Sequence, residues 1–145
     1  MNTRLTQEYE IRLPFVGADS ESIAMPSLAA ALSNAGGIGI LGNAGESALT
    51  TQALIQQVKR ATSKLFGVDL RVDDSPRGPV TVDAHIGVCI AEHVKLVVFN
   101  SQVPPRAWVD RLHAAGARVW MRAISVEQAV GAVAVGVDAI VVRPP

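Results

Sequence analysis

The sequence predicts an α/β protein in which parallel strands alternate with helices. Short apolar runs typical of buried strands are separated by segments with helical periodicity. The stretch Leu28–Gly39, LAAALSNAGGIG, shows the transition best, because an alanine-rich helix ends at a glycine pair and leads directly into an apolar strand. The phrases HAAGARVWM and VAVGVDAIVV repeat that order further along the chain. Strand and helix alternate every roughly 20–30 residues, the spacing of βαβ crossovers, so we expect a parallel sheet.

Six strands are expected, each short, apolar and buried on both faces. They are Pro14–Gly17, Ile38–Leu41, Phe66–Leu70, Leu96–Phe99, Arg118–Met121 and Ala139–Val142.

Five helices are expected between the strands. They span Met25–Ala35, Ala48–Ala61, Thr81–Glu92, Arg106–Ala115 and Ser125–Val135. Ser47 and Ser125 can cap helix N-termini, and Ser125 with Gln128 forms the pattern of a capping box. A glycine follows three of the helix ends, as is common at helix C-termini.

Two architectures suit this alternation, an open doubly wound sheet and part of a (β/α)₈ barrel. Gly37, Gly39 and Gly42 match the G-x-G-x-x-G dinucleotide fingerprint, but that fingerprint follows a strand and opens a helix, whereas these glycines follow a helix and surround a strand. We therefore interpret them as a helix C-cap and a close helix–strand contact. The length of 145 residues fits a single domain over residues 1–145.

Charge and composition argue against several classes of function. Thirteen basic and 13 acidic side chains leave no net charge, and only 4% of the residues are aromatic, so neither a nucleic-acid surface nor an anionic membrane surface is indicated. We expect no leader and no transmembrane segment, and a lone Cys89 cannot form an intramolecular disulfide. These features predict a cytoplasmic protein.

The histidines and the cysteine form no metal-binding pattern. His85 and His93 are expected on one helix, roughly 12 Å apart along its axis, which is too far for shared ligation. Cys89 falls on the same helix and is interpreted as a small core residue. No metal site is therefore expected.

The longer motifs carry a resemblance to a known family. RLPFVGADS, LAAALSNAGGIGILG, LFGVDL, VVFNSQVPP, LHAAGARV, SVEQAV and GVDAIVV occur in the order and at about the intervals seen in nitronate monooxygenases, also called 2-nitropropane dioxygenase-like proteins. Flavin-dependent enoyl reductases of fatty-acid synthesis look similar too. The resemblance implies a TIM barrel that holds FMN at the carboxyl ends of its strands and oxidises alkyl nitronates.

Compared with that family, the chain resembles the first six β/α units of the barrel. It ends at Arg143–Pro145, where the family continues into a glycine-rich loop with its catalytic histidine and into two further strands, whose loops commonly hold a phosphate. The resemblance thus implies a partial TIM barrel of about six strands and five helices, with two open sheet edges. Oligomerisation, a separately encoded barrel fragment or rearrangement into an open sheet could cover these edges.

The resemblance also indicates candidate cofactor-binding residues. After the first strand the family usually reads Ala-Pro-Met, with its backbone against the flavin, and this chain has Ala18, Asp19 and Ser20 there. An ionised Asp19 would disfavour a flavin that takes up negative charge on reduction. The third strand of the family usually ends in Gly-Val-Asn-Leu, and in this chain Asp69 stands in place of the Asn. An ionised Asp accepts hydrogen bonds but, unlike the Asn amide, does not donate them. Asp69 could bind a hydroxyl, a cation or a helix terminus, or it could cap the following loop.

Asn100 and Arg122 complete the set of candidate cofactor-binding residues. They follow the fourth and fifth expected strands, at the end of the sheet where barrel active sites lie. Together with Asp19 and Asp69 they form one expected polar cluster. Arg122 could bind an anion there, or it could pair with Asp69 or Asp19 and neutralise a buried carboxylate.

Two classes of function are consistent with these expectations. In the first, the chain is an FMN-dependent oxidoreductase of the nitronate monooxygenase type that is not competent alone and acts with a second copy or a complementary barrel fragment on a small-molecule substrate. In the second, it is a non-catalytic half-barrel that serves as an interaction or assembly module. No catalytic residue is assigned in either case.

Overall fold

A computed structural model describes residues 1–17, 25–42, 46–73 and 81–144. Its centre is a parallel sheet of five strands whose spatial order follows the chain. The strands are β1 (Gly39–Leu41), β2 (Phe66–Val72), β3 (Leu96–Ser101), β4 (Arg118–Ala123) and β5 (Ala139–Val142). This order, with a helix in each connection, confirms the predicted parallel β/α repeat.

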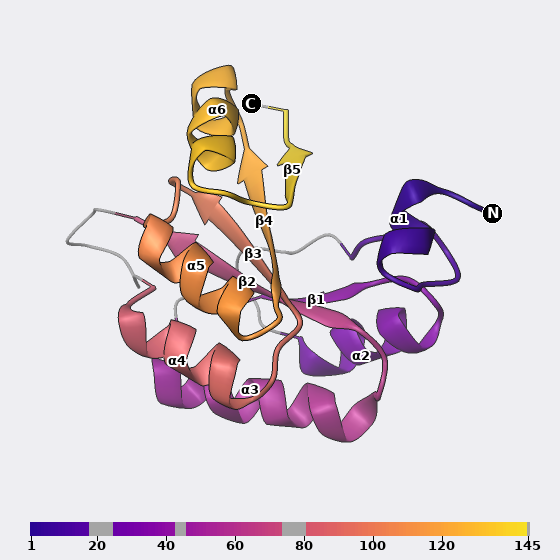
Figure 1. Cartoon of the computed structure of the whole chain (residues 1–145). Coiled ribbons are helices and arrows are strands. Elements are labelled where there is room, and N and C mark those ends of the chain that lie inside the picture. The colour runs from indigo at the N-terminus through magenta and orange to yellow at the C-terminus, as the bar shows by residue number, and fades with distance from the viewer. Residues whose placement is uncertain (18–24, 43–45, 74–80, 145) are drawn as a thin grey trace.

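Helices precede the first strand and occupy each connection between consecutive strands (Figure 1). They are α1 (Arg4–Glu8), α2 (Pro26–Asn34), α3 (Ala48–Ala61), α4 (Asp83–Ala91), α5 (Arg106–Ala114) and α6 (Val126–Ala134). The last five match the expected helices closely, whereas α1, capped by the Thr3 hydroxyl, was not expected. Figure 1 shows α2, α3, α4 and α5 along one side of the sheet and α1 on the other.

The predicted N-caps are confirmed, and the capping box is only half formed. The Ser47 hydroxyl accepts a hydrogen bond from the Thr50 backbone N–H, and the Ser125 hydroxyl accepts one from Gln128. The Gln128 side-chain oxygen, however, accepts a hydrogen bond at 3.1 Å from the backbone N–H of Ile124, the residue before the N-cap, and not from that of Ser125 itself. Its amide nitrogen donates to the Ser101 carbonyl at 2.8 Å, which ties α6 to the end of β3.

The prediction of a full strand at Pro14–Gly17 is wrong, because these described residues form only a single bridge. Val16 forms an isolated parallel bridge with Ile38, supported by hydrogen bonds from Ile38 N to Phe15 O and from Gly17 N to Ile38 O. Pro14 has no N–H to extend this ladder towards the N-terminus. The sheet therefore begins with a bridge followed by the three-residue strand β1.

The expectation that every strand is buried on both faces is wrong for β5. Within the described residues β5 pairs only with β4, and its residues are half-buried to exposed. Val142 at its end is 82% exposed. An edge strand without a second neighbour cannot be enclosed as the central strands are.

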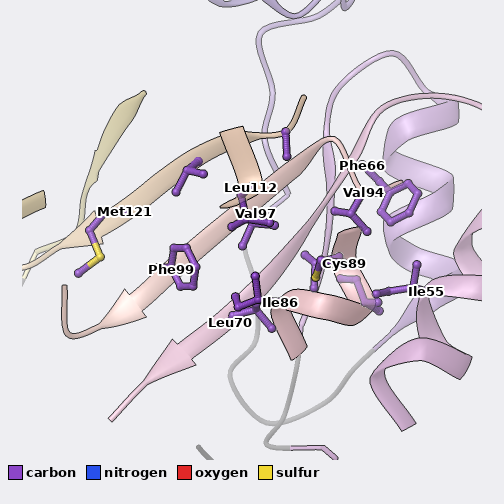
Figure 2. Close-up of a cluster of buried hydrophobic side chains, with 14 of the residues drawn as sticks. Ile55, Phe66, Leu70, Ile86, Cys89, Val94, Val97, Phe99, Leu112 and Met121 are labelled. Atoms are coloured by element: carbon purple, nitrogen blue, oxygen red, sulfur yellow. The ribbon is translucent and has the colours of Figure 1, made fainter. Parts of the chain in front are cut away.

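The main core lies between the sheet and helices α2–α5. Leu70, Val97, Phe99 and Met121 point from the strands towards Ile86 and Leu112 on the helices, as Figure 2 shows. A second cluster lies on the opposite sheet face, which we call the inner face and define by Ile38, Ile40, Leu96, Val98 and Trp120. Leu5, Tyr9 and Ile11 from the N-terminal segment pack against it. Alternation along each strand thus separates two apolar clusters.

The glycines after α2 have the structural roles expected of them. Gly36 has a φ of +108°, a left-handed conformation that favours glycine at a helix end. A Cβ on Gly39 would lie 1.8 Å from the Ala29 carbonyl oxygen, so only glycine lets β1 pass this close to α2. Among the described helices, none has both the length and the apolar character needed to cross a bilayer.

Candidate functional site

Three polar residues share the inner face near the carboxyl ends of adjacent strands. Asp69 lies on β2 opposite Val98 of β3, and Val98 lies opposite Trp120 of β4. Asn100 and Arg122 come two residues after Val98 and Trp120, so alternation places their side chains on the same face. The parallel sheet therefore brings Asp69 and Asn100 together although they are 31 positions apart in the sequence. No local sequence pattern links the two residues.

The Asp69 carboxylate is held by both of the other residues. Its Oδ1 accepts a hydrogen bond from Asn100 Nδ2, and its Oδ2 lies 3.1 Å from Arg122 Nη2. The Asp69 side chain is 1% exposed and that of Arg122 is 13% exposed. Of the alternatives considered for Arg122, the structure shows the pair with Asp69. Because a buried carboxylate needs a compensating cation, Arg122 neutralises Asp69 at this position.

The end of β3 beside this pair is conformationally unusual. Ser101 has a φ of +73°, and a non-glycine residue in the left-handed region costs on the order of 1–3 kcal/mol. The Ser101 hydroxyl lies 3.3 Å from Asn100 Oδ1, and its carbonyl accepts the hydrogen bond from Gln128. These contacts hold the turn in place and connect the amide that binds Asp69 to α6.

Two open pockets adjoin the pair and share Arg122 and Arg143. One, of about 300 Å³, is lined mainly by polar residues, namely Asn100, Ser101, Arg122, Gln128 and Arg143, together with Ile124 and Pro144. The other, of about 320 Å³, has a mostly apolar wall, and it is lined by Val16, Gly17, Ile40, Val98, Trp120, Arg122, Val141, Val142 and Arg143. Each is at the lower end of the range for small-molecule sites. Arg122 thus forms the boundary between a polar and an apolar hollow.

The structure brings together three of the six candidate cofactor-binding residues, Asp69, Asn100 and Arg122. The other three, Ala18, Asp19 and Ser20, lie outside the described residues. Sequence reasoning missed Arg143, Gln128 and Ser101 as lining residues. Arg143 follows β5 directly, so the rule that sites gather at the carboxyl ends of parallel strands could have identified it.

The histidines have structural contacts. His85 Nδ1 accepts a hydrogen bond from the Val82 N–H, and its Nε2 lies 2.9 Å from the Glu46 carbonyl oxygen. His93 lies beyond the end of α4 with a φ of +57°, so the expectation that it shares a helix with His85 is wrong. Cys89 is buried in the core, and burial raises the pKa of its thiol to about 12. Within the described ranges no group of three acidic, histidine or cysteine side chains could hold a metal ion.

Comparison with known proteins relates this geometry to one family. The sequence profile of the family described as nitronate monooxygenase matches residues 2–145. The nitronate monooxygenase of Pseudomonas aeruginosa is 30% identical over 176 aligned positions, covering 99% of this chain and 50% of the relative. A carboxyl-CoA dehydrogenase of Rhodococcus jostii, named for its hydroxy-methyl-oxo-octahydroindene substrate, is 31% identical over 99% of this chain and 39% of its own length.

Solved structures show the same partial match. FabK from Thermotoga maritima superposes with a TM-score of 0.84 at 31% identity, over 97% of this chain and 43% of that one. The nitroalkane oxidase from Streptomyces ansochromogenes superposes with a TM-score of 0.87 at 25% identity, over 97% and 48%. The chain therefore spans about half the length of the relatives it matches, and its fold is a partial TIM barrel.

Proposed function

Because the chain belongs to the nitronate monooxygenase family, we propose that it forms part of an FMN-dependent oxidoreductase of the nitronate monooxygenase type. The observation that carries the proposal is the Asp69–Asn100–Arg122 cluster at the carboxyl ends of three adjacent parallel strands, beside two pockets. Parallel β/α proteins place their ligands at this end of the sheet.

The chemistry of the inner face fits a flavin ring. Ile40, Val98 and Trp120 give one pocket an apolar wall, which suits a flat aromatic ring, and Arg122 and Arg143 supply cationic donors at its rim. When bound, FMN would supply the acceptor for the electrons removed from the substrate. The apolar wall therefore suits the flavin ring. The guanidinium groups suit the polar edge of that ring or an anionic substrate.

The role of Asp69 in this proposal is to position Arg122. A guanidinium has five N–H donors, and the contact with Asp69 uses only one side of it. Arg122 lines both pockets, where donors not used by Asp69 can bind an anionic oxygen. Asn100 fixes the other carboxylate oxygen, so the carboxylate and the arginine are held in one orientation.

We propose further that the described half-barrel is not competent alone. The chain spans about half the length of its relatives, and the two pockets are open rather than enclosed. Turnover requires that water be excluded and that the cofactor be enclosed, which one side of a barrel cannot provide. A second copy or a complementary barrel fragment would supply the rest.

Titration of FMN into the purified chain tests this proposal. We expect quenching of FMN fluorescence, weakened in Arg122→Lys, where a point charge replaces the planar fork. Arg106→Lys, on an exposed side chain of α5, should bind FMN as the unmodified chain does. A folded chain that never quenches FMN would overturn the flavin site. Bleaching of bound FMN by an alkyl nitronate, in a sample shown to be monomeric, would overturn only the statement that the chain needs a partner.

The second candidate function, a non-catalytic assembly module, is favoured by the exposed apolar residues at the β5 edge of the sheet. In that case the Asp69–Arg122 pair stabilises the sheet and the pockets bind no flavin. A folded chain that associates with a partner but never quenches FMN would support this function.

A further inference from the structure

A hollow at the amino ends of β2 and β3 is lined by every lysine of the chain. It has a volume of about 420 Å³ and is formed by residues 59, 62–66, 92, 93 and 95, which come from the end of α3 and from the segments that lead into β2 and β3. The sequence contains ten arginines but only three lysines, and Lys59, Lys64 and Lys95 all line this hollow. We call it the lysine hollow. It lies at the end of the sheet opposite to the candidate flavin site.

Helix geometry accounts for one of the three lysines. Lys59 lies in the last turn of α3, where a cation offsets the partial negative charge of the helix end. Its Nζ also donates to the Glu92 carbonyl at 3.0 Å and lies 3.3 Å from the Glu92 carboxylate. Lys64 and Lys95 lie outside the helices, and within the described residues no ion pair involves either of them. Two ammonium groups of the lysine hollow are therefore available to an anion.

The charges of the lysine hollow match a dianion. Three ammonium groups and the Glu92 carboxylate leave a formal charge of +2 when His93 is neutral. Glu92 stays ionised at neutral pH, because hydrogen bonds from Gln56 and Gln52 and the contact with Lys59 lower its pKa. A phosphate monoester carries about −1.5 to −2 charges at pH 7 and has three strong acceptor oxygens. A carboxylate, with a single charge, would compensate only half of the positive charge.

The backbone at His93 indicates that an imidazole is retained here at a conformational cost. Each of α2, α5 and α6 is followed by a glycine with positive φ, whereas α4 is followed by His93 with a φ of +57°. A non-glycine residue in the left-handed region is strained, and such residues are concentrated at ligand sites. His93 lines the lysine hollow, where its ring offers a further N–H donor.

The remaining wall of the lysine hollow is apolar. Phe66 is 9% exposed, Leu65 is half-buried, and the lysine stems add methylene groups. The Thr62 hydroxyl is already engaged, since it donates to Asn34 Oδ1 at 2.6 Å and accepts from the Lys64 N–H at 3.0 Å. The volume falls within the range of small-molecule sites. A ligand that fills this space needs an apolar group beside its charge.

We propose that the lysine hollow binds a soluble phosphate monoester with a small apolar group, whose phosphate contacts Lys64, Lys95 and His93. A lysine ammonium is a compact point charge that binds phosphate without a fixed geometry. The ten arginines lie outside the lysine hollow and the chain has no net charge, which argues against an extended polyanion such as a nucleic acid. The proposal does not depend on flavin binding, because the two sites share no residue.

Titration of the isotope-labelled full chain with phenyl phosphate, followed by NMR amide chemical shifts, tests the position of the site. We expect shifts at the amides of residues 62–66 and 92–95. Binding should weaken about tenfold or more in the double variant Lys64→Gln, Lys95→Gln. The matched control, Arg4→Gln with Arg106→Gln, removes the same charge from side chains that are 90% and 69% exposed, and it should bind normally.

His93→Gly separates a ligand-binding role from a structural one. Glycine relieves the left-handed backbone, so the variant should have a higher urea midpoint than the unmodified chain. It should nevertheless bind phenyl phosphate more weakly, because the imidazole donor is lost. Binding that is unchanged in this variant and in the lysine double variant would overturn the proposal.

A comparison of ligands tests the chemical class. Phenyl phosphate should bind more tightly than benzoate, which has the same ring with one charge, and more tightly than inorganic phosphate, which lacks the ring. Shifts confined to the amides around Asn100 and Arg122 would overturn the proposal. Sedimentation with phosphatidic acid vesicles by a chain that does not bind phenyl phosphate would also overturn it, in favour of a lipid headgroup.

Discussion

At the scale of single residues, the candidate site depends on one buried charge pair. Asp69 is almost completely enclosed, and Arg122 is largely so. Burying two ions costs desolvation energy that their attraction only partly offsets. A buried ion pair is therefore not explained by its contribution to the stability of the fold alone. Its position beside two pockets, at the carboxyl ends of the strands, supports the proposal that this pair serves ligand binding.

Arg122→Gln should destabilise the fold strongly. The substitution leaves the buried Asp69 carboxylate without its cation, which costs about 3–5 kcal/mol in the free energy of unfolding. Urea denaturation measures this value. Arg106→Gln is the control, because the Arg106–Asp110 pair is exposed and its loss costs at most about 1 kcal/mol.

A double variant separates the charge from the packing. Asp69→Asn combined with Arg122→Gln removes both charges and should recover most of the lost stability. If the double variant were no more stable than Arg122→Gln alone, the charge pair would not be the cause.

At the scale of secondary-structure elements, close backbone contacts decide how the helices sit on the sheet. The Ser33 hydroxyl links α2 to the sheet, because it donates to the Leu65 carbonyl at 2.7 Å and accepts from the Gly39 N–H at 2.9 Å. Gly39 passes directly under the Ala29 carbonyl. The sequence motif that resembles a nucleotide-binding loop is therefore a packing motif in this chain.

Gly39→Ala should be destabilising, whereas Gly87→Ala should be neutral or stabilising. At Gly39 the added Cβ meets backbone and must push α2 away from β1, at a cost of about 1–3 kcal/mol or more. At Gly87, within α4, a Cβ meets nothing within 4 Å, and alanine should gain about 0.5–1 kcal/mol through its higher helix propensity. Thermal unfolding of the two variants checks the opposite signs. Equal effects would contradict the packing role of Gly39.

A second contact between elements joins α3 to the end of α4. Glu92, the C-cap of α4, accepts hydrogen bonds from Gln56 and Gln52 of α3 and pairs with Lys59 at 3.3 Å. The Gln56 amide is the main cause that lowers the pKa of Glu92 below its ordinary value of 4.5. Since the folded state holds this proton less tightly, Glu92 adds stability above that value and loses the contribution as the pH falls through the lowered pKa.

Glu92→Gln should therefore reduce stability at neutral pH and have little effect in acid. The difference in urea midpoint between the unmodified chain and the variant should be constant near neutrality and shrink below about pH 4.5. A difference that stayed constant into acid would contradict the role of the Glu92 charge.

At the scale of the whole molecule, the N-terminal segment closes one end of the inner face. The Trp120 indole N–H donates to the Tyr9 hydroxyl at 2.6 Å, and the two rings meet edge to face with centroids 5.2 Å apart. The Arg118 guanidinium lies 5.7 Å from the centre of the Tyr9 ring. Burial is the main cause that raises the pKa of the Tyr9 hydroxyl, so it remains a neutral partner of the indole. The first residues of the chain thus stabilise β4.

Tyr9→Phe should cost about 1–3 kcal/mol, because it leaves the buried indole N–H without an acceptor while keeping the ring contact. Urea denaturation followed by tryptophan fluorescence measures the loss. An unchanged midpoint would show that the hydrogen bond contributes nothing beyond the ring packing.

Much of the fold was predictable because its signals are local. The helix at Ala48–Ala61 and the strand at Ala139–Val142 were expected with the bounds that the structure shows. Serine caps, glycine stops and hydrophobic periodicity act within a few residues of one another. Two strand expectations failed at the borders of the sheet, at Pro14–Gly17 and in the burial of β5, because burial there depends on neighbours far away in the chain.

The sequence by itself determined the alternation of strands and helices, the caps and the candidate residues Asp69, Asn100 and Arg122. Only the tertiary structure decided that Arg122 pairs with Asp69, that Arg143 and Gln128 border the same pocket, and that the valines of α6 remain exposed. The physical reason is the distance along the chain over which each interaction acts. Periodicity and capping follow from contacts within one turn or strand, whereas charge pairing and uncovered surfaces follow from which distant segments meet in space.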